Sequence, residues 1–293
     1  MANGNETALR HCRFLNEDYF QELYDTFIEA FSDYVVPFAL TETQFRNHII
    51  LTAVDLERTA GCIQANELVG FSLNGFGHWE EKLTVYDAGT GVIPAHRRQG
   101  ISNEMFALML PVFKDRGFEQ YLLEVVTTNA GAIDLYAKMG FNVERELALL
   151  QCDGELNASA HELPNIEIRH IPEPDWILLL SFWDGKPSWQ NSVDAVKRSM
   201  KMKKFLGAFD GGKCVGYIVF SSKLGRVAQL AVSKDHRNRG VGTLLVRAMQ
   251  TETSDGPSMQ VINIDKSITT AMNFFLNRGF FERLSQHEMV MVM

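Results

Sequence analysis

The sequence predicts an α+β protein (mixed α/β) built from two tandem copies of one domain. Its 293 residues, 46% hydrophobic and 22% charged, can bury a large core and come closer to the length of two domains than of one. Three short segments recur in the same order about 140 residues later. Each copy also follows the order strand, glycine turn, helix, strand, helix. Together these observations predict a duplicated domain that contains both strands and helices.

The recurrences can be measured between their glycines. The displacements are 146, 140 and 139 positions for three pairs of segments, LVGFSL and CVGYIV (Gly70 and Gly216), VIPAHRRQGIS and VSKDHRNRGVG (Gly100 and Gly240), and LYAKMGF and FFLNRGF (Gly140 and Gly279). Between the copies, residues 151–167 are polar and contain Gly, Asn, Ser and Pro, which is typical of a connector. We therefore expect the domains to span residues 1–158 and 159–293.

The elements around the glycine turns follow from residue periodicity. Alternation of residues and β-branched side chains predict strands at ELVGFSL (67–73), YLLEVV (121–126) and MQVINI (259–264). Helical spacing after the first glycine turn predicts a helix on the apolar residues Ile101, Met105, Leu108, Met109 and Val112. Stripes of this kind are typical of core packing, so we do not expect them to form a ligand surface.

Composition excludes several classes of partner. A net charge of −8 and a pI near 5.5 argue against nucleic acid, which requires clustered Lys and Arg. The four cysteines lie far apart without metal-ligand spacing, so the sequence predicts free buried thiols, no disulfide framework and no metal site. The N-terminus lacks a signal-peptide pattern, and the longest apolar run, WILLLSFW at 176–183, is too short to span a bilayer. We expect a cytoplasmic protein with no membrane partner, and the sequence leaves its oligomeric state open.

The two glycine turns are candidate anion sites. A strand that turns directly into a helix leaves backbone N–H groups unpaired at the positive end of the helix dipole, and glycine lets a phosphate come close. A single match of this kind is more often an ordinary helix start, but its duplication favours a binding role. The predicted phosphate-binding residues are Arg97, Arg98, Gln99, Gly100, Ile101 and Ser102 in the first copy, and Arg237, Asn238, Arg239, Gly240, Val241 and Gly242 in the second.

These turns resemble the signature [Arg/Gln]-x-x-Gly-x-[Gly/Ala] of the GNAT superfamily of acyl-coenzyme A dependent N-acyltransferases. The resemblance covers most of the chain as two tandem copies, and is most specific in TGVIPAHRRQGIS followed by NAGAIDLYAKMGF. It implies a mixed, mostly antiparallel sheet, splayed where the co-substrate enters, with helices on both faces. It also implies acetyl-coenzyme A as co-substrate, with its pyrophosphate on the turn and its pantetheine arm on the preceding strand, at Val92 and Ile93. The chemistry needs no metal.

The same resemblance assigns two residues of the first copy. Tyr136, four residues before Gly140, matches the tyrosine that protonates the leaving thiolate. Asn129 matches the usual asparagine at the start of that helix, and the resemblance implies that it contacts the co-substrate. In the second copy Phe275 and Ile268 stand at these positions, whereas the first copy departs only at Ser102. A missing general acid costs roughly 10²- to 10⁴-fold in rate, so the second copy has lost more. The tyrosine ring could instead serve packing alone.

Candidate bases for the attacking amine are Asp87 and Glu124, although either carboxylate could be merely structural or solvated. At the position of Glu124 the second copy has Asn263. The resemblance further places the acceptor pocket near residues 31–38 and 75–83, although Phe31, Tyr34 and Trp79 could equally belong to the core. We therefore expect an acetyl-coenzyme A dependent N-acetyltransferase acting on a small-molecule amine, with catalysis in the N-terminal domain. Two alternatives are catalysis in the C-terminal domain, where the signature is complete, and a non-catalytic acyl-coenzyme A binding or sensing protein.

Overall fold

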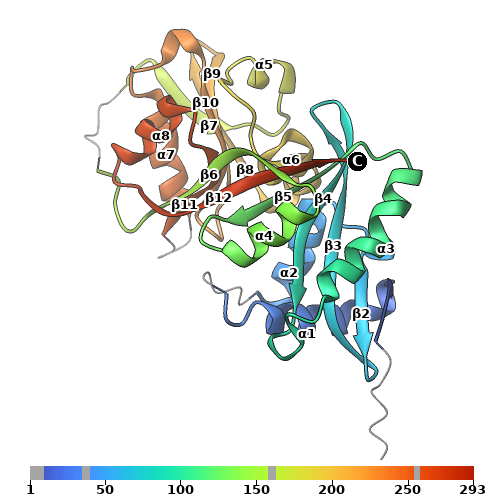
Figure 1. Ribbon diagram of the computed structural model, residues 1–293. Coiled ribbons are helices and arrows are strands. Elements are labelled where there is room, and N and C mark those ends of the chain that lie inside the picture. The colour runs from blue at the N-terminus through green and yellow to red at the C-terminus, as the bar shows by residue number, and fades with distance from the viewer. Residues whose placement is uncertain (1–9, 35–39, 158–162, 254–257) are drawn as a thin grey trace, which may run out of the picture. The chain divides into compact units, whose positions relative to one another are not determined.

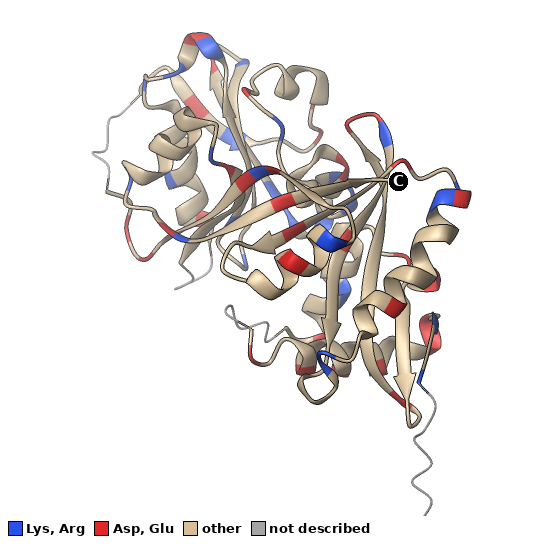
Figure 2. Cartoon of the chain, viewed as in Figure 1, with Lys and Arg blue, Asp and Glu red and all other residues tan. Residues whose placement is uncertain are grey.

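The computed structural model describes residues 10–34, 40–157, 163–253 and 258–293 (Figure 1). The chain divides into two compact units. Unit 1 contains residues 1–123, 139–142 and 290–293, and unit 2 contains residues 124–138 and 143–289. No helix among the described residues is both long and apolar enough to cross a membrane. Lys and Arg are interspersed with Asp and Glu along the ribbon (Figure 2).

Unit 1 is built on a mixed sheet with helices on both faces. Its strands lie in the order β1-β2-β3-β4-β5, antiparallel except for the parallel pair β4 and β5. Gly70 of β3 faces α3, because an added Cβ would lie 2.9 Å from Ile101 Cγ2, whereas the next residue, Phe71, packs against Phe27 of α1 with ring centroids 5.6 Å apart. Neighbouring residues of a strand point to opposite faces, so α1 and α3 cover the two sides. The elements are β1 (His11–Phe14), α1 (Phe20–Ala30), α2 (Glu42–Thr52), β2 (Ala60–Gln64), β3 (Glu67–Trp79), β4 (Lys82–Val92), α3 (Ile101–Asp115) and β5 (Gln120–Val126).

One cysteine prediction is wrong. Cys12 and Cys62 form a disulfide, because β1 and β2 pair with these two residues directly opposite each other. Their separation of 50 residues hides this neighbourhood in the sequence. Cys152 and Cys214 are free thiols, as expected.

Unit 2 repeats the arrangement. Its strands include the order β6-β11-β10-β9-β8-β7, in which only β10 and β11 are parallel. Gly216 faces Leu245 of α7, and Tyr217 packs in the cluster that contains Leu179 of α5, so helices again cover both faces. The elements are α4 (Ala130–Lys138), β6 (Asn142–Cys152), β7 (Ile166–His170), α5 (Trp176–Leu180), α6 (Val193–Arg198), β8 (Lys204–Asp210), β9 (Lys213–Ser221), β10 (Arg226–Val232), α7 (Val241–Glu252), β11 (Met259–Asp265), α8 (Thr269–Leu276) and β12 (Phe281–Val292). The predicted mixed, mostly antiparallel fold with flanking helices is confirmed in both units.

The two copies exchange their last strands. β6 belongs to the first copy by sequence, yet it pairs with β11 of the second. Within unit 2, Lys266 N donates to Glu146 O and Thr127 N donates to Ser285 O, both at 3.0 Å. The positions 127 and 146 of the first copy match 266 and 285 of the second, each displaced by 139. Because of this exchange, the two compact units do not have the same bounds as the two sequence copies. The bounds of the copies, 1–158 and 159–293, remain a prediction from the sequence.

Candidate active site

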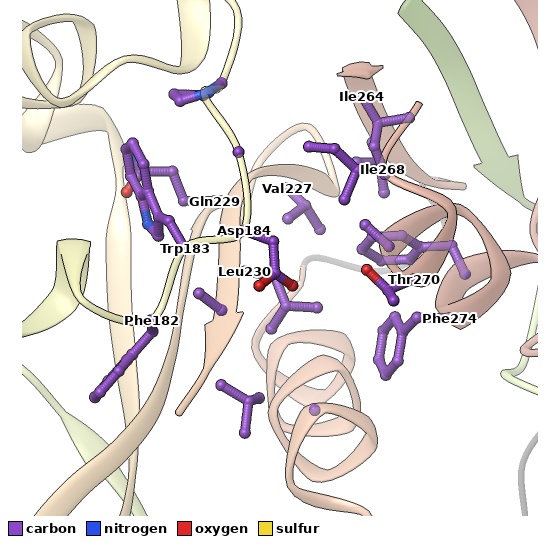
Figure 3. Close-up of a pocket in the computed structure, with 18 of the residues that line it drawn as sticks. Phe182, Trp183, Asp184, Val227, Gln229, Leu230, Ile264, Ile268, Thr270 and Phe274 are labelled. Atoms are coloured by element: carbon purple, nitrogen blue, oxygen red, sulfur yellow. The ribbon is translucent and has the colours of Figure 1, made fainter. Parts of the chain in front are cut away.

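A cavity opens in unit 2 where two parallel strands separate. β10 and β11 pair only at Arg226–Val227 and Gln260–Val261, and a register shift follows in β11. Beyond this point the strands diverge, and a cavity of about 690 Å³ lies between them. In Figure 3 the side chains of Trp183 and Gln229 lie on one side of the close-up, those of Ile268, Thr270 and Phe274 lie on the other, and Asp184 and Leu230 lie between them. Its size suits a small organic ligand.

Three residues that line this cavity, Trp183, Gln229 and Asn191, are connected through Tyr217 by a chain of hydrogen bonds. Tyr217 OH accepts a hydrogen bond from Trp183 Nε1 at 2.6 Å and donates to Gln229 Oε1 at 3.1 Å. Gln229 Nε2 then donates to Asn191 O at 2.7 Å. Burial raises the pKa of Tyr217, so the phenol stays neutral. These polar groups are fixed in place before any ligand enters.

The two predicted phosphate turns have the same backbone conformation. Arg98 and Gly100 have φ values of 61° and 82°, and Asn238 and Gly240 have values of 58° and 90°. Each turn follows a short 3₁₀ segment, Pro94–His96 or Lys234–His236, and leads directly into α3 or α7. A run of alternating left-handed residues turns successive N–H groups toward one point and makes an anion-binding concavity. Left-handed backbone is costly for Arg98 and Asn238, which indicates a conformation imposed by the turn.

The N–H groups of both turns have no acceptor in the described part of the chain. Among the described residues, no acceptor is found for the backbone N–H groups of residues 98–103 or of residues 238–243. The first intrahelical bonds begin only with Glu104 N to Gly100 O and Leu244 N to Gly240 O. An added Cβ at Gly100 would meet no atom within 4 Å, so the first turn is open to a ligand. The residues therefore fit a pyrophosphate, as expected for acetyl-coenzyme A.

The side chains of the predicted turn residues divide into two groups. Arg98, Gln99, Asn238 and Arg239 are exposed, whereas Ile101 and Val241 are buried at the helix starts. Gln99 O and Gln99 Oε1 accept from Arg10, which also pairs with Glu104 of α3. The guanidinium groups of Arg97 and Arg237 donate hydrogen bonds to other groups of the protein.

The strand before the first turn is tied to its neighbours. Val92 O accepts from Arg97 Nε at 3.1 Å, and Ile93 N donates to Val69 O at 3.0 Å. The parallel pairing of β4 with β5 ends at Asp87 and Leu123, so β4 continues toward the turn without that partner. This is the position expected for a strand that binds an extended ligand arm.

Asp87 lies in a buried polar network of unit 1. It is 6% exposed, and its two oxygens accept from Gly89 N at 2.9 Å and from Thr90 Oγ1 at 2.8 Å. Thr90 Oγ1 also lies 2.9 Å from Ser72 Oγ. Nearby Tyr121 has its pKa raised by burial and by the charge of Asp87. With both oxygens occupied, Asp87 is arranged as an acceptor that orders the core.

Glu124 and Asn263, which match in the two copies, contact each other within unit 2. Asn263 Nδ2 donates to Glu124 Oε1 at 3.4 Å. Asn263 is 3% exposed and has a left-handed φ of 55° in the irregular part of β11. Glu124 is half-buried, so its carboxylate is more accessible than that of Asp87.

Tyr136 and Asn129 both belong to the α4 region of unit 2, whereas the first turn belongs to unit 1. Tyr136 is a buried residue of α4, with 8% exposed. Asn129 Oδ1 accepts from Ala132 N at 3.2 Å and caps this helix. In the second copy Phe275 is equally buried, and Ile268 at the start of α8 provides no side-chain cap. The asparagine therefore has a structural role in addition to the predicted contact with the co-substrate.

The complete signature of the second turn has a packing explanation. A Cβ added at Gly242 would lie 2.9 Å from Phe274 Cε2, so glycine makes room for this ring. The first copy has Ser102 at this position, half-buried in the first turn of α3. Gly242 is thus no evidence by itself that the second turn binds a phosphate.

Some residues of the site were not found in the sequence. Trp183, Gln229 and Asp184 line the cavity but lie in segments without a recognised motif. Their contacts join residues 34 to 53 positions apart, which no local pattern reveals. Of the predicted acceptor segment 31–38, residues 35–38 lie outside the described part of the chain.

Each copy has two parallel strands that pair over only part of their length, followed by a turn whose N–H groups have no acceptor among the described residues. This arrangement is typical of proteins that bind a phosphate-bearing ligand at the start of a helix. Sequence models agree, because the Acetyltransferase (GNAT) family matches residues 13–141 and the Acetyltransferase (GNAT) domain matches residues 186–290. The chain therefore belongs to the GNAT acetyltransferases, as a tandem-repeat member.

Individual relatives are distant. A streptothricin acetyltransferase of Streptomyces lavendulae is 35% identical over 75 residues, which span 26% of this chain and 39% of the relative. A GCN5-related N-acetyltransferase from Sphaerobacter thermophilus has a TM-score of 0.74 at 14% identity and covers 97% of this chain and 95% of its own. A tandem GNAT protein from the clavulanic acid biosynthesis pathway has a TM-score of 0.73 at 15% identity, covering 97% of this chain and 98% of its own. At these identities the structures show the fold alone.

Proposed function

We propose that this protein transfers an acetyl group from acetyl-coenzyme A to an amine of a small molecule, and that the N-terminal copy performs the transfer. The observation that carries the proposal is the open first turn, where the N–H groups of residues 98–103 have no protein acceptor among the described residues. When bound, acetyl-coenzyme A supplies the activated acetyl group. The turn holds its pyrophosphate, and the strand at Val92 and Ile93 binds its extended arm.

Two side chains of the first copy act in the transfer. Tyr136 donates its phenolic proton to the leaving sulfur, a role that Phe275 cannot fill. Glu124 receives the proton of the attacking amine, directly or through a water molecule. Glu124 suits this role better than Asp87, because Asp87 is more deeply buried and already accepts hydrogen bonds at both oxygens.

The first test is a thiol-release assay with acetyl-coenzyme A and a panel of amines, including streptothricin because of the relative noted above. We expect amine-dependent release of coenzyme A and calorimetric binding of acetyl-coenzyme A by the intact chain. Binding without transfer to any amine would instead support an acyl-coenzyme A sensor. If the chain neither bound acetyl-coenzyme A nor transferred an acetyl group to any amine, the whole proposal would be contradicted.

A second candidate is catalysis in the C-terminal copy. It is favoured by the cavity of about 690 Å³ beside the second turn, which lies entirely within unit 2. The absence of a tyrosine at Phe275 opposes it. Variants of the two turns, described in the Discussion, separate these candidates.

A further inference from the structure

The first arginine of the N-terminal turn makes four hydrogen bonds within unit 1. Arg97 Nη1 and Nη2 donate to the two carboxylate oxygens of Asp33 at 2.6 and 2.7 Å. Nη2 also donates to Ala30 O at 2.9 Å, and Nε donates to Val92 O at 3.1 Å. One guanidinium thus joins the last residue of α1, the segment after it and the end of β4.

The arginine of the second turn binds the same kinds of group, an aspartate and two backbone carbonyls. Arg237 Nη1 lies 2.8 and 2.7 Å from the two oxygens of Asp184, Nη2 donates to Phe182 O at 2.8 Å, and Nε donates to Val232 O at 2.9 Å. We call each set of contacts a clamp, Arg97–Asp33 in unit 1 and Arg237–Asp184 in unit 2.

The two clamps are alike although the chain around them is not. The preceding helix has 11 residues in α1 and 5 in α5, and the arginine follows its aspartate by 64 positions in unit 1 and by 53 in unit 2. The same kinds of partner, one carboxylate and two backbone carbonyls, are therefore bound in both copies despite an insertion or deletion between the partners. Arginine suits this role because its planar fork matches a carboxylate and holds its orientation.

In unit 2 the clamped segment is part of the cavity wall. In unit 2 the segment contains Phe182, Trp183 and Asp184, all of which line the cavity, and Asp184 lies near the centre of the close-up (Figure 3). In unit 1 the corresponding segment contains Phe31 and Tyr34, whose rings pack edge to face at 5.4 Å. In unit 2 the clamp thus connects a wall of the cavity to the start of the turn, and we expect the matching segment of unit 1 to have the same place in its site.

We propose that Arg97 and Arg237 are positioning residues that hold this wall, through Asp33 and Asp184, and that they do not bind the phosphates with their side chains. The inference rests on the proposed function and specifies how one part of that site is arranged. Phosphate binding is then left to the backbone N–H groups of the turn. Hydrogen bonding to Arg97 also lowers the pKa of Asp33, so the clamp persists throughout the neutral range.

Two substitutions separate positioning from phosphate binding. In Asp33→Asn and in Arg97→Gln we expect the KM for the best amine of the panel to rise roughly 5-fold, with kcat and the calorimetric Kd for acetyl-coenzyme A nearly unchanged. The double variant should be no worse than either single variant, because both remove one clamp. Asp33→Glu keeps a carboxylate, so its KM for the amine should rise less than that of Asp33→Asn. A phosphate contact would instead weaken acetyl-coenzyme A binding in Arg97→Gln alone, and that result would overturn the proposal.

Hydrogen exchange gives a readout that does not depend on activity. Tyr34 N donates to Phe31 O at 3.1 Å within the clamped segment, and we expect its exchange to become faster in both single variants. If the intact protein neither binds nor transfers acetyl groups, the proposed function fails while this measurement still tests the clamp. Unchanged exchange together with an unchanged KM in an active protein would contradict the clamp and leave the function standing.

Discussion

The two phosphate turns have nearly the same backbone but different surroundings. Both place left-handed residues at their second and fourth positions and leave the same N–H groups without an acceptor in the described protein. An added Cβ meets nothing at Gly100, whereas at Gly240 it lies 3.5 Å from Leu163 Cδ1, and Gly242 is matched to Phe274. The copy with the complete signature is therefore the more closely packed one. A signature glycine can be required by a neighbouring ring as well as by a ligand.

Blocking each turn in the intact chain tests this comparison most strongly. In Gly100→Trp we expect transfer to fall below detection, because the indole occupies the space of the pyrophosphate, while Gly240→Trp leaves thiol release largely unchanged. Both positions have positive φ, so tryptophan also strains the backbone there, and control variants must show the effect of this strain alone. Gly117→Trp and Gly212→Trp are matched controls, with φ of 81° and 83° and no atom within 4 Å of the added Cβ. Loss of transfer in Gly240→Trp alone would move catalysis to the second copy.

The second difference between the copies is the proposed general acid, which is Tyr136 in the first copy and is replaced by Phe275 in the second. We expect Tyr136→Phe to lower kcat roughly 10²-fold, with acetyl-coenzyme A affinity within a few fold, because the phenol acts on the leaving sulfur. In the Gly100→Trp background, Phe275→Tyr should not create transfer, since Ile268 and Asn263 also differ from the first copy. Steady-state kinetics and calorimetry on the same samples distinguish the two effects. An unchanged kcat in Tyr136→Phe would remove this residue from the mechanism.

Among the described residues, only the first copy carries a disulfide. Reducing Cys12–Cys62, or replacing both residues by serine, should lower the free energy of unfolding by roughly 2–4 kcal/mol, because the link restricts the unfolded chain. Urea unfolding with and without dithiothreitol measures the change. Serine at the free thiol Cys214 is the control, and the reductant should have no further effect in the double-serine variant. Equal stability in both conditions would contradict this expectation.

The smallest expected effect concerns the helix starts. Asn129→Ala removes the side-chain acceptor of Ala132 N and should lower the free energy of unfolding by about 1 kcal/mol. Ile268 provides no side-chain cap, so its replacement by alanine should change stability only through packing, where its Cδ1 approaches Gly185. Hydrogen exchange at Ala132 and at the start of α8 separates the two causes. Slow exchange at Ala132 in Asn129→Ala would show that the cap contributes little.

Local patterns predicted the elements well and the long-range contacts poorly. The strands at 67–73, 121–126 and 259–264 lie within β3, β5 and β11, and Ile101, Met105 and Met109 are buried in α3 as their spacing indicates. Within the described segments, the N–H groups of both glycine turns lack an acceptor, as predicted. The disulfide, the clamps and the strand exchange were missed, because each joins positions that only the folded topology brings together. Catalytic roles for Tyr136, Glu124 and Asp87 stay predictions.

The exchanged strands have a consequence for synthesis of the chain. Unit 1 contains residues 1–123 together with residues 290–293, and Met293 N donates to Glu119 O at 2.9 Å. A ribosome that has translated the first copy has therefore not yet supplied every residue of the first unit. Folding of that unit must be completed after the second copy has been made, and a gene fragment that ends between the repeats would encode a protein with an unfilled sheet edge.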